Sequence, residues 1–258
     1  MARWKWFIVD IASLLVIWET ISILIPHAAS LLPPPELVGV ELYRLAASGE
    51  LWKNVVASLA RIFNGFALAV VTGIPMGMLI GSSKTIRNVT EPLIEVTRPI
   101  SPIAWIPLSI LWFGIGEGSK VFIIWLITFF FVLLNTISGV VGVDKKLFEA
   151  AQTLGASRQF IWRKVVIWAA LPSIFVGLRL GLGVSIGGVL IAEMVAAESG
   201  VGFMMERARV VGNSKPVIIG MITVGLLGYF ANRFALIIEG MLLKYRRFSG
   251  FRGLNANE

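Results

Sequence analysis

The stretch VFIIWLITFFFVLLNTISGVVGV, residues 121–143, decides the class of this protein because it carries no charged side chain. A helix rises about 1.5 Å per residue, so this stretch is long enough to cross the hydrocarbon core of a bilayer, which is about 30 Å thick. The whole chain is 57% hydrophobic and 15% charged, whereas ordinary soluble domains carry about 25% charged residues. Such a chain cannot cover a soluble surface, and we therefore expect a membrane protein.

Five further apolar stretches lead to a prediction of an all-α, polytopic membrane protein with about six transmembrane helices. The predicted spans are residues 7–26, 55–80, 92–113, 121–143, 173–191 and 217–243. The first is interrupted by Asp10 and Glu19 and is too long for a signal peptide, so we expect it to be retained. In the second, Gly73, Gly77 and Gly81 recur at the four-residue spacing that lets helix backbones approach closely. Residues 1–258 are predicted to form a single transmembrane domain.

The basic residues predict the orientation of the chain. Lys and Arg gather in the loop 82–88, the segment 144–168 and the tail 244–252, and the side of the membrane with more of these residues is normally the cytoplasm. Both termini are therefore predicted to be cytoplasmic, and the net charge of +8 needs no nucleic-acid partner. With no cysteine and one histidine, His27, the chain is predicted to hold no metal. We expect no enzyme, because no nucleophile–base pair is found.

The cytoplasmic segment DKKLFEAAQTLGAS, residues 144–157, has the pattern of a short capped helix. Asp144 is a good N-cap residue, and an apolar face recurs at helical spacing over Leu147, Phe148, Ala151 and Leu154. Gly155 is expected to stop this helix, and a second amphipathic piece begins near Ser157 and ends at Leu171-Pro172. Two functions fit equally well, a rigid knob that a partner protein grips and a helix that lies on the lipid headgroups.

The pattern Glu149-Ala150-Ala151-x-x-x-Gly155 resembles the EAA signature of the permease subunits of bacterial ABC importers. The stretches RPISPIAWIPLSILWFGIG (98–116), GLRLGLG (177–183) and AEM (192–194) resemble the branch that transports taurine, aliphatic sulfonates, nitrate and bicarbonate. This branch often has an extra proline where this chain has Trp168, which leaves the local bend open.

The resemblance implies a type I ABC importer permease fold in the bacterial inner membrane, surrounded by lipid. It implies a permease homodimer, two ATP-binding subunits in the cytoplasm and an extracytoplasmic solute-binding protein. The residues that would contact the ATPase are Glu149, Ala150, Ala151, Leu154, Gly155, Ala156 and Ser157. ATP and Mg²⁺ would be bound by the partner ATPase, since this chain lacks G-x-x-x-x-G-K-[ST] and is expected to carry no cofactor. The substrate would be a small anion such as a sulfonate, nitrate, bicarbonate or carboxylate.

The third predicted span is the best candidate for the wall of the pathway. It contains Pro99, Pro102 and Pro107, and proline in a helix removes a hydrogen bond and clashes with the preceding turn. Broken backbone at membrane depth is tolerated where protein or a water-filled cavity satisfies it, although a merely kinked helix is an alternative. The candidate pathway residues are Arg98, Ser101, Pro102, Trp105 and Pro107, followed by Asn135, Arg179 and Glu193. The Asn135 side chain is as consistent with a bridge between helices, and that of Glu193 with an outer gate or a loop cap.

Two ionisable residues at similar depth predict an ion pair. Glu19 precedes Pro26 by about two helical turns, and Arg61 lies about as far into the next span, which runs in the opposite direction. The alternative is that Glu19 reaches out to the headgroups while Arg61 lines the pathway. An ion-coupled secondary transporter is the main functional alternative, but such carriers have inverted repeats, and we find none in the sequence.

Overall fold

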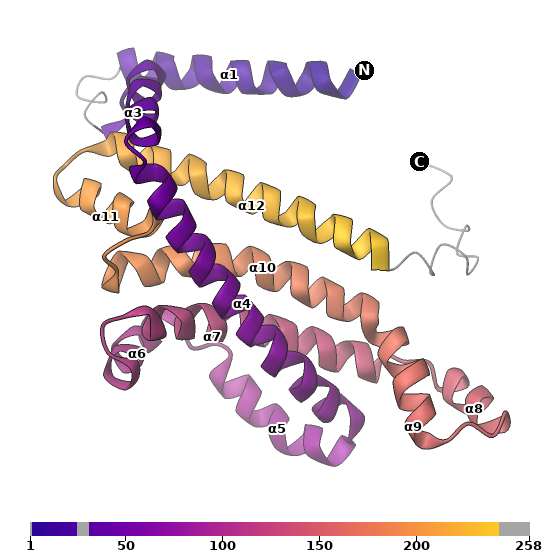
Figure 1. Cartoon of the computed structure of the whole chain (residues 1–258). Helices are drawn as coiled ribbons and strands as arrows, with labels where there is room; N and C mark the ends of the chain where they lie inside the picture. The colour runs from indigo at the N-terminus through magenta and orange to yellow at the C-terminus, as the bar shows by residue number, and fades with distance from the viewer. Residues whose placement is uncertain (1, 25–30, 243–258) are drawn as a thin grey trace. The chain divides into compact units, whose positions relative to one another are not determined.

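The computed structural model describes residues 2–24 and 31–242, and its described secondary structure is entirely helical, as predicted (Figure 1). His27 and the basic tail from residue 244 lie outside the described residues. The helices are α1 (Ala2–Leu24), α3 (Pro35–Ala47), α4 (Glu50–Ser82), α5 (Lys84–Thr97), the 3-10 helix η1 (Pro102–Trp105), α6 (Ile106–Phe113), α7 (Glu117–Val141), α8 (Lys145–Thr153), α9 (Arg158–Ile161), the π-helix η2 (Trp162–Val166), α10 (Ile167–Ala196), α11 (Val201–Val210) and α12 (Ser214–Leu242).

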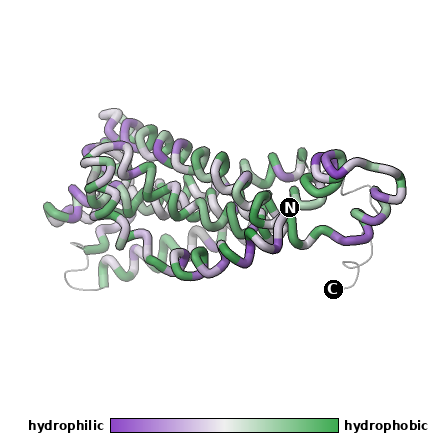
Figure 2. Tube along the Cα trace, turned by 90° about the horizontal axis from the view of Figure 1, so that it is seen from below, coloured by the Kyte–Doolittle hydropathy of each residue, from purple (hydrophilic) through white to green (hydrophobic). Residues whose placement is uncertain are grey.

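Four helices of the described chain are long and apolar enough to cross a membrane, namely α4, α7, the run Arg158–Val195 and α12. Figure 2 shows hydrophobic residues spread along the helical trace. Two shorter apolar helices, Ser13–Leu24 and Pro102–Phe113, lie in the first and third predicted spans. The polytopic all-α class is confirmed, while the count of six membrane passages stays a prediction.

The third predicted span is broken, as its prolines indicated. Helix α5 ends at Thr97, residues 98–101 are not helical, and the chain resumes as η1 and α6. The loop predicted over residues 82–88 is wrong, because α5 already begins at Lys84. The hydroxyl of Ser83 caps α5 by accepting a bond of 3.4 Å from the amide of Ile86. The helix is amphipathic along its whole length, so the predicted loop residues belong to the same helix as those that follow.

Two further boundaries differ from the prediction. The polar stretch 193–215, predicted to be a loop, contains the helix α11. Pro172, predicted to end the second amphipathic piece, instead lies inside α10. A π-helical turn, η2, precedes α10, so the backbone leaves the regular hydrogen-bond ladder about two to three turns before this proline.

Backbone proximity divides the chain into two compact units, each of which is built from two stretches of sequence. The first comprises the described parts of Met1–Ala60 and Leu190–Leu226, and the second those of Arg61–Val189 and Leu227–Glu258. The single-domain organisation stays a prediction. In the first unit, α3 and α11 share an apolar core that includes Leu45 and Val201.

The second unit is organised around close packing of α4 against α7. A β-carbon built at Gly73, Gly77 or Gly81 would meet Val132, Thr136 or Val140, respectively, at 3.1, 2.6 and 2.8 Å. Both helices therefore contribute residues at four-residue spacing, and the close approach predicted from the glycines is confirmed. The indole Nε1 of Trp125 on α7 also donates to the hydroxyl of Thr72 on α4 at 3.0 Å.

Candidate functional sites

The segment after α7 is the short helix α8, which is capped at both ends. The carboxylate of Asp144 accepts from the amide of Lys146 at 2.9 Å, as predicted for an N-cap. At the other end of α8, Gly155 has φ +74°, and the amides of Gly155 and Ala156 donate to the carbonyls of Gln152 and Ala151 at 2.9 and 3.0 Å. These paired bonds form a Schellman motif, which glycine favours because it adopts positive φ without strain.

The next helix begins where the sequence indicated. The hydroxyl of Ser157 accepts from the amide of Phe160 at 3.3 Å, so Ser157 is the N-cap of α9. The predicted apolar face of α8 is only partly correct. Phe148 and Ala151 pack on a core that includes Val166 and Ala170, whereas Leu147 is 47% exposed and Leu154 is 86% exposed. The segment therefore exposes Leu154 next to Gly155, while Phe148 and Ala151 hold α8 against η2 and α10.

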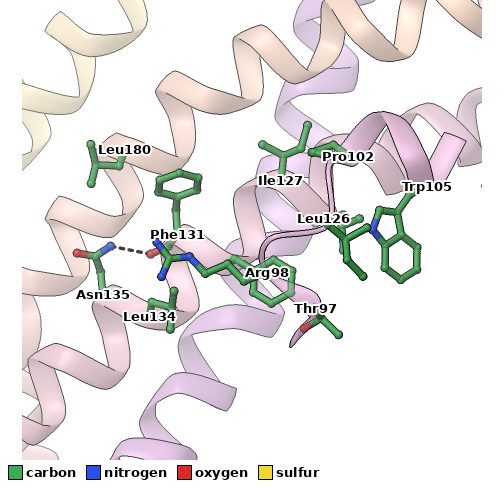
Figure 3. A pocket seen from close by; sticks show the side chains of 12 residues that line it. Thr97, Arg98, Pro102, Trp105, Leu126, Ile127, Phe131, Leu134, Asn135 and Leu180 are labelled. Atoms are coloured by element: carbon green, nitrogen blue, oxygen red, sulfur yellow. Dashed lines mark hydrogen bonds between the residues drawn. The ribbon is translucent and has the colours of Figure 1, made fainter. Parts of the chain in front are cut away.

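A pocket of about 490 Å³ lies at the break between α5 and η1 (Figure 3). Four candidate pathway residues line it: Arg98, Pro102, Trp105 and Asn135. The guanidinium of Arg98 points toward the side of the pocket where Asn135 lies, and the amide nitrogen of Asn135 donates to the carbonyl of Phe131 at 2.8 Å. Arg98 is the one ionisable residue among those that line this pocket, all of which lie in the described chain.

The other predicted pathway residues lie elsewhere. Ser101 and Pro107 are exposed residues that do not line this pocket. The guanidinium of Arg179 on α10 is 3.6 Å from the carboxylate of Glu239 on α12, which assigns it to an ion pair between two long helices.

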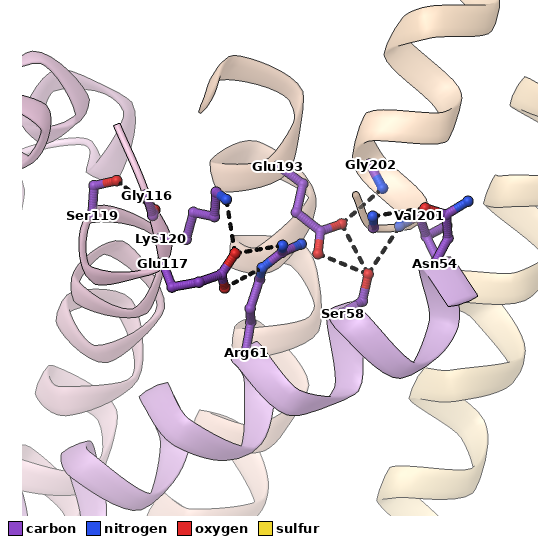
Figure 4. A network of polar contacts seen from close by, with 11 residues as sticks. Asn54, Ser58, Arg61, Gly116, Glu117, Ser119, Lys120, Glu193, Val201 and Gly202 are labelled. Carbon is purple, nitrogen blue, oxygen red and sulfur yellow. Dashed lines mark hydrogen bonds and ion pairs between the residues drawn. The ribbon is translucent and has the colours of Figure 1, made fainter. Parts of the chain in front are cut away.

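Arg61 forms an ion pair with Glu117, which the sequence did not indicate, and the predicted ion pair between Glu19 and Arg61 stays a prediction. The Nε and an Nη of Arg61 each donate to a carboxylate oxygen of Glu117 at 2.7 Å, and the ammonium of Lys120 lies 3.0 Å from the same carboxylate (Figure 4). The side chains of Arg61 and Lys120 are 4% and 5% exposed, whereas that of Glu117 is 62% exposed. The packing of α4 on α7 brings these residues together, since Arg61 lies on α4 and Glu117 begins α7.

Glu193 lies in a polar cluster of the first unit and caps a helix. The residue is 1% exposed, and its carboxylate accepts bonds of 2.8 Å from the hydroxyl of Ser58 and 2.9 Å from the amide of Gly202, the second residue of α11 (Figure 4). Ser58 accepts in turn from the amide of Val201, and Asn54 accepts from that of Gly200. These contacts favour the loop cap over the outer gate for Glu193.

Four residues of these two clusters are absent from the sequence-based candidates: Asn54, Ser58, Glu117 and Lys120. The sequence does indicate some of them. Asn54, Ser58 and Arg61 are spaced by four and three residues, so they form a polar stripe on an otherwise apolar helix. No comparable pattern marked Glu117, which directly follows a glycine in a short loop.

A family model described as the binding-protein-dependent transport system inner membrane component matches residues 69–242. The chain belongs to this family. The match begins within α4 and ends with α12, so it includes the capped segment around α8 and the pocket at Arg98. As a permease of this family, the chain is the membrane component of an ATP-driven importer, and the alternative of an ion-coupled secondary transporter is not supported.

Similar curated proteins cover nearly the whole chain. A putative ABC transporter permease of Methanocaldococcus jannaschii is 40% identical over 90% of this chain and 88% of its own length. The taurine transport system permease protein TauC of Escherichia coli is 37% identical, over 88% of this chain and 87% of TauC. The nitrate import permease protein NrtB of Synechocystis is 32% identical, over 91% of this chain and 88% of NrtB.

Solved structures confirm the fold. An amino acid ABC transporter determined with histidines has a TM-score of 0.65 at 19% identity, over 77% of this chain and 96% of that one. The inward-facing MetNI methionine ABC transporter has a TM-score of 0.61 at 20% identity, over 73% of this chain and 95% of that one. The permease of this family therefore has the type I importer fold that the sequence resemblance implied.

Proposed function

We propose that this permease imports a small anion, such as a sulfonate, nitrate, bicarbonate or carboxylate, across the bacterial inner membrane. The observation that carries the proposal is the pocket at the α5–η1 break, whose one ionisable residue is Arg98. An arginine that faces a cavity in a membrane protein favours an anion as its partner. The names of similar permeases, which include taurine and nitrate transport, support the same class of solute.

The permease works as a homodimer with two ATP-binding subunits and an extracytoplasmic solute-binding protein, and both its termini lie in the cytoplasm. It performs no covalent chemistry itself and needs no cofactor, because ATP and Mg²⁺ are bound by the ATPase. Closure of the two ATPases on ATP moves the capped segments, and the spans alternate between inward-open and outward-open arrangements as rigid bodies.

The segment that contacts the ATPase comprises α8 and its cap: Glu149, Ala150, Ala151, Leu154, Gly155, Ala156 and Ser157. Its construction suits mechanical coupling. The exposed Leu154 offers an apolar anchor, and Phe148 packs into a core with Val166 and Ala170. Since Ala170 lies on α10 and α10 also supplies Leu180 to the pocket, a displacement of α8 can be transmitted to the pocket wall through one packed helix.

The test is co-purification and uptake with the complete transporter. Leu154→Glu places a charge on the proposed contact and should abolish ATPase association and ATP-driven uptake. The thermal stability of the permease should be unchanged, because the side chain is 86% exposed. Val210→Glu is the matched control, as Val210 is 72% exposed near the end of another short helix, α11, and ATPase association should survive there. Full association and uptake with Leu154→Glu would refute the coupling role.

A further inference from the structure

The pocket at the α5–η1 break lies beside the middle of the long apolar helix α7. Its lining residues on α7 run from Leu126 to Asn135, while the helix extends over Glu117–Val141. At 1.5 Å per residue, Leu126 is about 13 Å from the start of α7 and Asn135 about 9 Å from its end. The volume of about 490 Å³ falls within the range of about 300–1,000 Å³ that is usual for small-molecule sites.

Arg98 places a single positive charge at one end of this pocket, where it can bind one negative charge. Arg98 forms no ion pair with any other described residue, although Glu91 and Glu95 line a neighbouring pocket that it also borders. A guanidinium presents two parallel N–H donors, which match two oxygens of a sulfonate or carboxylate. The amide of Asn135 keeps one N–H beyond the bond it donates to Phe131, so it can add a third donor.

The rest of the pocket is apolar. Leu126, Leu134 and Leu180 line it together with the aromatic rings of Trp105, Phe130 and Phe131, and no lining residue carries a carboxylate. A solute tail of methylene groups would be stabilised there by the removal of apolar surface from water. An ammonium group on the same tail would lose its hydration without gaining an opposite charge.

We infer that this pocket is a solute-binding site of the permease itself, selective for a monoanion with an uncharged aliphatic tail, such as a short alkanesulfonate. We identify the bound anion with the imported solute, and this identification rests on the proposed function. The pocket discriminates among the anions left open above. It favours an alkanesulfonate over nitrate, which has no tail, and over taurine, which carries an ammonium group.

Binding to the full-length permease in nanodiscs, measured by isothermal titration calorimetry, tests this site. Along the series from methanesulfonate to hexanesulfonate, the affinity should rise about fourfold per methylene and then level off as the pocket fills. Taurine should bind at least about tenfold more weakly than ethanesulfonate, from which it differs by its ammonium group. Equal binding of these two, or affinity that keeps rising through octane- and decanesulfonate as it would in an open lipid groove, would overturn the inference.

Two substitutions on α5 connect the binding to Arg98. Arg98→Gln removes the charge and should weaken butanesulfonate binding about tenfold or more, with Arg98→Lys between this variant and the unmodified protein. Arg87→Gln is the matched control, because Arg87 lies on the same helix and lines only the neighbouring pocket, so butanesulfonate binding should not change. Equal losses in Arg98→Gln and Arg87→Gln would show a general charge effect and overturn the site.

Uptake by the complete transporter in proteoliposomes separates the two proposals. If ATP drives butanesulfonate import at the same rate in Arg98→Gln and in the unmodified protein, the import function stands and the site is refuted. If the permease shows the expected selectivity in nanodiscs but no anion is imported with ATP, the site stands and the proposed function fails.

Discussion

The close contact between α4 and α7 makes a quantitative prediction at Gly77. An alanine β-carbon at this position would lie 2.6 Å from the β-carbon of Thr136 and 2.9 Å from the carbonyl oxygen of Leu133. Non-bonded carbons rest at about 3.5–4.0 Å, so Gly77→Ala must push the two helices apart by about 1 Å at this point. Neither neighbouring atom is the end of a flexible side chain, so the strain cannot be relieved by a rotamer change.

The expected cost follows from two opposing effects. Overpacking of this kind costs about 1–3 kcal/mol, while glycine to alanine inside a helix gains up to about 1 kcal/mol of helix propensity. We expect a net loss of about 1–2 kcal/mol in the free energy of unfolding. For a chain of this size, the melting temperature should fall by about 2–8 °C. The measurement is thermal unfolding of the detergent-solubilised permease, followed by tryptophan fluorescence.

Matched glycines make the measurement decisive. Gly183→Ala on α10 has no atom within 4 Å of the added β-carbon and should leave the melting temperature unchanged or slightly higher. Gly73→Ala meets Val132 Cγ1 at 3.1 Å and should lower it less than Gly77→Ala does, because a side-chain methyl can yield by a few tenths of an ångström. If Gly77→Ala melts at the same temperature as Gly183→Ala, the close approach of α4 and α7 is refuted.

Three predictions concern the buried polar clusters. Glu117→Gln removes the carboxylate that Arg61 binds through two bonds, and it should cost roughly 1–2 kcal/mol in a denaturation assay because it leaves the buried guanidinium without this charge. Glu206→Gln is the control and should not change stability, because its partner Arg209 is 65% exposed and water can replace the lost bonds. Gly200→Ala should yield no monodisperse protein on size exclusion, because its φ is +118° and its β-carbon would overlap the carboxylate of Glu193; normal yield would contradict this geometry. Glu193→Gln should fold but lose about 1–3 kcal/mol, and an unchanged melting temperature would contradict the stabilising role of its bonds to the Gly202 amide and the Ser58 hydroxyl.

The features that the sequence predicts well depend on local chemistry. The apolar stretches mark the four long helices because hydropathy needs no knowledge of neighbours. The roles of Asp144, Gly155 and Ser157 are also confirmed, since a cap is formed by residues within one turn of the helix end. The glycine spacing at Gly73 and Gly77 identified a packing face, although it could not identify the helix that packs there.

The partner of Arg61 shows what was missing. A depth argument gives only the position of a side chain along the membrane normal, and it does not say which helix lies beside it. The partner also depends on which helix lies beside Arg61. The glycine face of α4 packs on α7, so α7 is that neighbour. Once that pairing is known, Glu117 at the first position of α7 becomes an acidic candidate, because the two helices pack in parallel and contacts that pair Gly73 with Val132 and Gly77 with Thr136 place Arg61 near the start of α7.

The prolines explain why the pocket lies where it does. Pro92 and Pro172 are inside helices, whereas Pro102 and Pro107 occupy the first turns of η1 and α6. In a first turn, proline loses no intrahelical hydrogen bond and its fixed φ suits the helix, so these two positions favour new helix starts over the continuation of α5. A helix that restarts at Pro102 forces the preceding residues out of helical geometry and leaves Arg98 at the C-terminal cap of α5. The lone cation of the pocket is therefore a consequence of where the helix must stop, and a substitution that lets α5 continue through residue 102 would remove the site without touching Arg98.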